Sequence, residues 1–168
     1  MPLVVEDGTG LLNAESYGPV SEADVYLEDT GYAPEWASFS ATKKEGLLRA
    51  ATRTADNSMD FRGNILKDTQ ALSFPRENLY DREGRLIVGI PLHLRQGIYE
   101  LAYSMSQNNY LTDSETSSLD SVRVGPIALE LSSSAKITKT LPDMVIRLLG
   151  EYGRYRWGKV RMRPLSVG

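Results

Sequence analysis

The chain has 168 residues, of which 41% are hydrophobic and 24% are charged, and its formal net charge is −3. It contains no cysteine and one histidine, which excludes disulfide bonds, a thiol nucleophile, cysteine-based zinc sites and a metal site of several histidines within one chain. No apolar run reaches the roughly 18–20 residues of a membrane helix, and the acidic N-terminus lacks the basic start of a signal peptide, so we expect a soluble intracellular protein.

The first half of the chain contains two helical patterns after a Gly- and Ser-rich opening. Residues 20–31 predict a helix with Ser21 as its N-cap, Asp24 in the capping-box position and Gly31 as its stop. A short aromatic connector follows, in which Trp36 is predicted to fill the core. A second helix is predicted from near Thr42, its capping residue, to near Met59, with one apolar face made of Leu48, Ala51, Ala55 and Met59.

The second half contains two further helical patterns, separated by a polar stretch at 106–121 and a segment of period two. The segment 122–131 predicts two short strands that form a hairpin. Pro91 and Pro142 mark the starts of the two helices, because proline is tolerated in a first turn. Their apolar faces are Leu94, Ile98, Leu101, Ala102 and Met105 in the first, and Val145, Leu148, Leu149 and Tyr152 in the second, which runs over about 141–151.

These elements predict a mainly α fold. It is a small bundle of three to four helices with an inserted β-hairpin and extended N- and C-terminal segments. We assign residues 1–153 to a helical domain with its β insertion around 122–131, and residues 154–168 to an extended docking segment.

Charge is distributed unevenly between the two ends. Residues 1–31 carry seven acids and no Lys or Arg, whereas residues 151–168 carry one acid and five bases. The basic end alternates with period two, which suits an extended strand that leaves its own bundle and adds to another chain. The residues predicted to bind a partner or a neighbouring subunit are Arg154, Tyr155, Arg156, Trp157, Lys159, Val160, Arg161, Met162 and Arg163.

The sequence shows little catalytic chemistry. No phosphate-binding loop, dinucleotide fingerprint, zinc-protease motif or nucleophile elbow is found, and no calcium loop fits. His93, in the first turn of the third helix, is predicted to be exposed or capping. We therefore expect no catalytic residue, no metal and no cofactor, and we expect that the protein is not an enzyme. A nucleic-acid role stays open, because Arg pairs with phosphates and Tyr or Trp stacks on bases, although the sequence pI near 5.3 weighs against it.

Several segments together are similar to a family of tailed-phage proteins: the opening "EDGTG" with "SEAD", the block "QALSFPR", "IPLHLRQGIYELA" and "VRVGPIALEL". This family is described as head–tail connector (adaptor, head-completion) proteins and is also labelled DnaT-like single-stranded-DNA-binding proteins. The resemblance implies a structural protein of the bacteriophage virion neck, assembled in the host cytoplasm without a membrane. It implies a ring, commonly of twelve subunits, that binds the portal protein and a tail or tail-terminator protein. Packaged double-stranded DNA would pass through its channel.

In such a ring the segment around "QALSFPRENLYDREG" would supply contacts between subunits. The alternative is an ordinary crossover in which Phe74 fills the core of its own bundle. The residues predicted to lie between subunits are Leu72, Phe74, Arg76, Glu77, Asp81, Arg82, Glu83 and Arg85.

Overall fold

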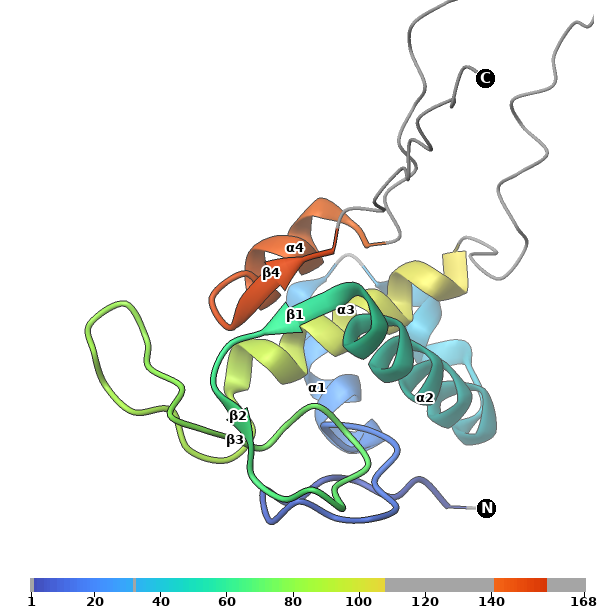
Figure 1. Cartoon of the computed structure of the whole chain (residues 1–168). Coiled ribbons are helices and arrows are strands. Elements are labelled where there is room, and N and C mark those ends of the chain that lie inside the picture. The colour runs from blue at the N-terminus through green and yellow to red at the C-terminus, as the bar shows by residue number, and fades with distance from the viewer. Residues whose placement is uncertain (1, 32, 108–140, 157–168) are drawn as a thin grey trace, which may run out of the picture.

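The computed structural model describes residues 2–31, 33–107 and 141–156. Over these residues the fold is mainly α, as predicted, with four α-helices (Figure 1). They are α1 (Val20–Thr30), α2 (Ala41–Ser58), α3 (Leu92–Gln107) and α4 (Asp143–Leu149), and a 3₁₀ turn, η1 (Pro34–Ser38), joins α1 to α2. The long helices α2 and α3 pack against each other, and α4 packs on α3.

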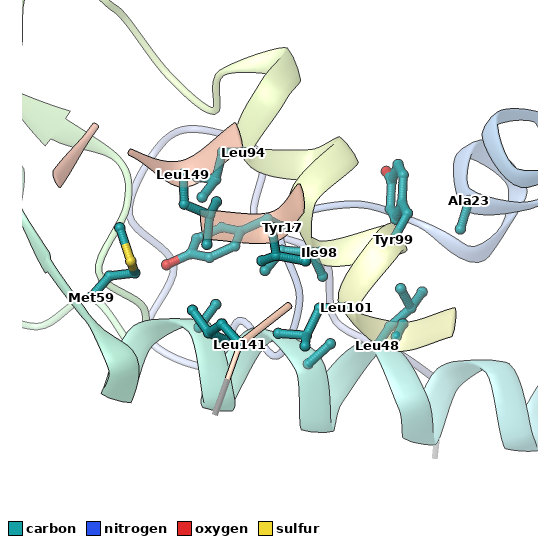
Figure 2. Close-up of a cluster of buried hydrophobic side chains, with 14 of the residues drawn as sticks. Tyr17, Ala23, Leu48, Met59, Leu94, Ile98, Tyr99, Leu101, Leu141 and Leu149 are labelled. Atoms are coloured by element: carbon teal, nitrogen blue, oxygen red, sulfur yellow. The ribbon is translucent and has the colours of Figure 1, made fainter. Parts of the chain in front are cut away.

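The core forms where the apolar faces of these helices meet, and the predicted faces are confirmed except at Leu148, which is half-buried and lies outside the core cluster. Side chains from α2, α3 and α4 converge with Tyr17 from the N-terminal loop (Figure 2). Burying each large aliphatic side chain contributes about 1.5–3 kcal/mol, so this cluster is the main source of stability. The predicted face residues that are buried are Leu48, Ala51, Ala55, Met59, Leu94, Ile98, Leu101, Ala102, Val145, Leu149 and Tyr152.

Two short antiparallel strand pairs occur among the described residues, and of their four segments the sequence predicted only that of β4, from residue 154, to be extended. β1 (Met59–Phe61) continues from α2 and pairs with β4 (Gly153–Tyr155). β2 (Asn64–Ile65) pairs with β3 (Arg76–Glu77). The hairpin predicted at 122–131 lies outside the described residues.

Gly31 ends α1 as predicted, with φ of +70°, but the predicted N-caps of α1 and α2 were wrong. α1 begins one residue before Ser21, and its N-cap is Pro19, with no side-chain hydrogen bond. Asp24 is not a capping residue, because its carboxylate accepts hydrogen bonds from Trp36 Nε1 and Lys44 Nζ, at 2.8 and 2.9 Å. Tertiary contacts therefore take the carboxylate that a capping box would have used.

At α2 the cap is displaced by two residues from the predicted Thr42. Ser40 Oγ accepts the hydrogen bond from Lys43 N at the start of the helix. Trp36 is 2% exposed, as expected of a residue that fills the core.

The "EDGTG" motif is a structural loop built around a buried carboxylate. Glu6 is 3% exposed and accepts hydrogen bonds from the backbone N–H groups of Gly8, Gly10 and Leu11. Gly8 and Gly10 have φ values of +94° and +76°, which lets the chain curl tightly around one side chain. Ala71 N then donates to Leu11 O, so this loop is tied to the segment that leads to β3.

Candidate functional site

The block "QALSFPR" folds into its own chain. Phe74 is 0% exposed, and its ring makes edge contacts with Tyr17, Phe61 and Tyr152 at centroid distances of 5.0–6.0 Å. The peptide between Phe74 and Pro75 is cis. With no surface left for a neighbour, Phe74 takes the alternative role, filling the core of its own bundle, and its assignment to a subunit contact is corrected.

Arg76 is also occupied within this loop. Its guanidinium donates to the carbonyl oxygens of Arg62, Ser73 and Gly63, at 2.6, 2.9 and 2.8 Å. Arg76 therefore ties the turn between β1 and β2 to Ser73, which precedes β3, whereas the sequence predicted that it would pair with a neighbouring subunit. Glu77 is exposed and Leu72 is partly buried, and both still present surface.

A hydrogen-bonded pair, Tyr17 and Asp56, holds the "QALSFPR" block in place, and the sequence did not predict it. Tyr17 Oη donates to Asp56 Oδ1 at 2.6 Å, while Ser73 N donates to Asp56 Oδ2 at 2.9 Å. Burial raises the pKa of Tyr17 well above its ordinary value, and burial also raises the pKa of Asp56. In the sequence, only the position of Asp56, directly after the buried Ala55 of α2, indicated a buried carboxylate.

Residues 80–89, which we call the arm, project from the bundle beyond the β2–β3 pair (Figure 1). Tyr80 and Leu86 form a bridge across the arm. The Asp81 carboxylate closes its tip by accepting hydrogen bonds from Glu83 N, Arg85 N and Arg85 Nε, at 2.7–2.9 Å. The backbone hydrogen bond from Arg85 is the main cause of the lowered pKa of Asp81. Asp81 and Arg85, both predicted to pair between subunits, therefore pair with each other.

A groove of about 300 Å³, which we call the arm groove, separates the arm from the helices behind it. The arm contributes Arg82, the first turn of α3 contributes His93, and α4 contributes Arg147. Arg62 spans the same region, because its guanidinium donates to the carbonyl oxygens of Tyr80 and Glu151. The remaining lining residues are Met144, Leu148 and Glu151.

The arm groove is cationic. Within the described ranges, no ion pair engages Arg82 or Arg147. The carboxylate among the lining residues, that of Glu151, lies 3.1 Å from His93 Nδ1. The N-terminus of α3 reaches the groove at His93, where the aligned backbone dipoles of the helix add partial positive charge. The side chain of His93 is 54% exposed, as predicted.

The basic C-terminal segment begins inside the fold. Arg154 and Tyr155 belong to β4, which is extended as predicted but pairs with β1 of the same chain. Arg156 is held as well, because its backbone N–H donates to Ser58 O and its guanidinium pairs with Asp60. The prediction that the strand leaves its bundle at residue 154 was therefore wrong for 154–156. Trp157, Lys159, Val160, Arg161, Met162 and Arg163 lie outside the described residues.

The described part of the chain contains neither a cluster of metal-binding side chains nor a membrane-spanning helix. No group of three or more His, Cys, Asp or Glu side chains is placed there to hold a metal ion. No helix among residues 2–31, 33–107 and 141–156 has the length and apolar character needed to cross a bilayer.

The described part of the chain is therefore a small helical domain with a projecting arm and a groove lined by cationic side chains. The family model described as "Putative DnaT-like ssDNA binding protein" matches residues 1–163. The chain belongs to this family. No curated protein and no solved structure matches it.

Proposed function

We propose that the protein binds single-stranded DNA and that the arm groove is the contact surface. The observation that carries this proposal is the position of Arg82 and Arg147, which have no ion pair within the described ranges and lie on opposite sides of a groove that also holds His93. The description of the family supports the same function. Binding in this groove needs neither a metal nor a cofactor, and we propose a binding protein rather than an enzyme.

The groove supplies both kinds of contact that an unpaired strand uses. Arg82 and Arg147 pair with phosphates, and Arg62 lies close enough to extend the phosphate track. His93 in the groove, and the 49% exposed Tyr80 on the arm outside it, offer aromatic faces on which bases stack without sequence preference. Because the whole chain carries a net charge of −3, we expect modest affinity for DNA. Because the arginines release counterions from the phosphates, this affinity should fall as the salt concentration rises.

The double substitution Arg82→Ala with Arg147→Ala tests this function. We expect it to weaken binding of a labelled oligothymidine at least about tenfold in fluorescence anisotropy, and to reduce the salt slope by about 0.7 for each phosphate that the variant no longer neutralises. Arg53→Ala is the control, because Arg53 is an exposed arginine of α2 that does not line the groove. Equal weakening in the Arg53 variant, or no binding by the wild type, would contradict the proposal.

A second candidate is the ring-forming head–tail adaptor of a tailed phage. The observation that favours it is the apolar surface of the arm, where Tyr80, Leu86 and Val88 are 49%, 55% and 79% exposed. Side chains this apolar are suited to burial against a neighbouring subunit or a partner protein. In this role the protein would sit in the virion neck with the portal protein, a tail protein and the packaged DNA.

Mass measurement with and without purified portal protein separates the two functions. The adaptor function predicts a ring on the portal, and Leu86→Ser with Val88→Ser should abolish it. These substitutions change no charge and lie outside the arm groove, so they should leave oligothymidine binding unchanged. Absence of any portal complex for the wild type would remove the adaptor candidate.

A further inference from the structure

A second hollow, separate from the arm groove, lies between α1 and the start of α3. We call it the α1 groove, and its volume is about 490 Å³. Val25 and Leu92 line it and are 60% and 56% exposed, although both are large apolar side chains. Tyr26 and Tyr99 line it as well, with their rings 5.9 Å apart. Apolar side chains gathered in a hollow are suited to burial against another protein surface.

The arm has one face toward its own bundle and one face toward solvent. Ile87 packs against the core of its own chain, and its backbone N–H donates to Leu79 O at 2.8 Å. Side chains alternate along an extended segment, so the neighbours of Ile87, Leu86 and Val88, face away from the bundle. The inward contacts of Ile87 hold the arm in place, and its outer face therefore cannot turn into the α1 groove of the same chain.

The α1 groove offers negative charge to an occupant. The exposed carboxylate of Asp29 lies at its edge, and no ion pair engages Asp29 within the described ranges. The carboxylate of Glu22 is already taken by Arg95 and by the phenol of Tyr99, so it adds nothing for an occupant. No Lys or Arg of the described residues lines the groove.

The tip of the arm offers positive charge. Arg82 is exposed, and no ion pair engages it in the part of the chain that the structure describes. The side chain of Arg85 is 78% exposed, whereas that of its partner Asp81 is only 13% exposed. The two exposed arginines therefore outweigh Glu83, the exposed acid of the tip. The outer face of the arm and the α1 groove match in both apolar character and charge.

We propose that the arm of one copy of this chain docks in the α1 groove of a second copy. Leu86 and Val88 pack on the apolar floor of the groove, and the arginines of the tip lie beside Asp29. The contact joins two unlike surfaces, and every copy carries one of each. The proposal deepens the adaptor candidate by naming the surface that receives the arm, and it rests on that candidate for its biological role.

Two surface variants each remove one side of this contact. The groove variant, Val25→Ser with Leu92→Ser, keeps the arm, and the arm variant, Leu86→Ser with Val88→Ser, keeps the groove. The four positions are 55–79% exposed, so both variants should fold, which circular dichroism checks. In sedimentation velocity, each variant alone should self-associate at least about tenfold more weakly than the wild type, for which we expect a micromolar Kd.

An equimolar mixture of the two variants tests whether the arm and the groove meet each other. The groove variant supplies an intact arm and the arm variant supplies an intact groove, so the mixture should form heterodimers with an affinity within about tenfold of the wild type. It should stop at dimers, because the other arm and the other groove are both disabled. Leu12→Ser with Ile65→Ser is the control, since these exposed residues belong to neither surface, and it should associate like the wild type.

Four results would overturn the proposal. A wild type that stays monomeric up to about 1 mM would show that copies do not bind each other. Undiminished association of the groove variant, or of the arm variant, would show that the altered surface takes no part. A mixture that stays monomeric would show that the two surfaces do not meet. Neither DNA nor portal protein enters these experiments, so a ring on the portal or binding of oligothymidine would survive their failure.

Discussion

Replacing Phe74 with alanine is expected to lower the free energy of unfolding by about 3–5 kcal/mol, the usual effect for a fully buried aromatic side chain. The ring is 0% exposed and touches three other rings from distant parts of the chain, those of Tyr17, Phe61 and Tyr152. Its removal leaves a cavity that the loop, held by Gln70 and Arg76, cannot easily close. Urea denaturation should show a lower midpoint at an unchanged slope.

Val88→Ala is the control for this experiment, because Val88 is 79% exposed. Its effect should stay within about 0.5 kcal/mol. The two variants also separate the two roles predicted for Phe74 from the sequence. A Phe74→Ala protein of normal stability that failed only to associate with other chains would restore the subunit role and contradict the core assignment.

Raising the pH above about 10 is expected to unfold the protein steeply. Four tyrosines have raised pKa values in the folded state, with burial as the main cause in each: Tyr17, Tyr26, Tyr99 and Tyr152. Burial raises the pKa of Tyr26 and of Tyr152 to about 12. The phenols of Tyr26 and Tyr99 also donate hydrogen bonds to Glu100 and Glu22, which adds to the rise in their pKa values.

The direction follows from linkage between protonation and folding. A tyrosine whose folded pKa exceeds its unfolded pKa contributes stability that is present below about pH 10 and is lost as the pH rises through the folded value. Tyr17, which is 1% exposed, should by itself reduce stability by about 1.4 kcal/mol per pH unit above pH 10.

Circular dichroism and phenolate absorbance, followed together during an alkaline titration, check this expectation. The buried tyrosines should ionise together with unfolding, in one cooperative step. Tyr26→Phe should make the transition less steep, whereas Tyr80→Phe, at a half-exposed position of the arm, should not alter it. Ionisation of all tyrosines while the helices persist would contradict the burial argument.

Periodicity was sufficient to predict the helices and most of the core. Leu94, Ile98 and Leu101 recur at helical spacing, and burial of such a stripe needs only a neighbouring helix, whichever one it is. Caps were predicted less well, because Asp24 is used by Trp36 and Lys44, and both partners follow α1 in the chain. The capping-box motif predicts only local hydrogen bonds, whereas the Asp24 carboxylate is taken by partners from other elements.

The candidate site was harder to predict from the sequence, because it depends on pairs that are distant along the chain. Arg82, His93 and Arg147 come from three separate segments, and nothing local marks them as neighbours. The same is true of Tyr17 and Asp56, which are 39 residues apart. Of the residues predicted for subunit contacts, Arg82 alone lines the arm groove. Arg76, Asp81 and Arg85 are occupied within their own loops, since a charged loop can satisfy itself as easily as a partner.

The pairing of β4 with β1 has a consequence for how the chain folds during its synthesis. Among the described residues, Leu141, Val145, Leu149 and Tyr152 complete a core whose other members all precede residue 108, and the 33 residues 108–140 separate the two contributions. At about 5–20 residues per second, a ribosome needs roughly 2–7 s to add that stretch. Until residues 141–155 have been added, the apolar faces of α2 and α3 lack the partners that α4 and β4 supply.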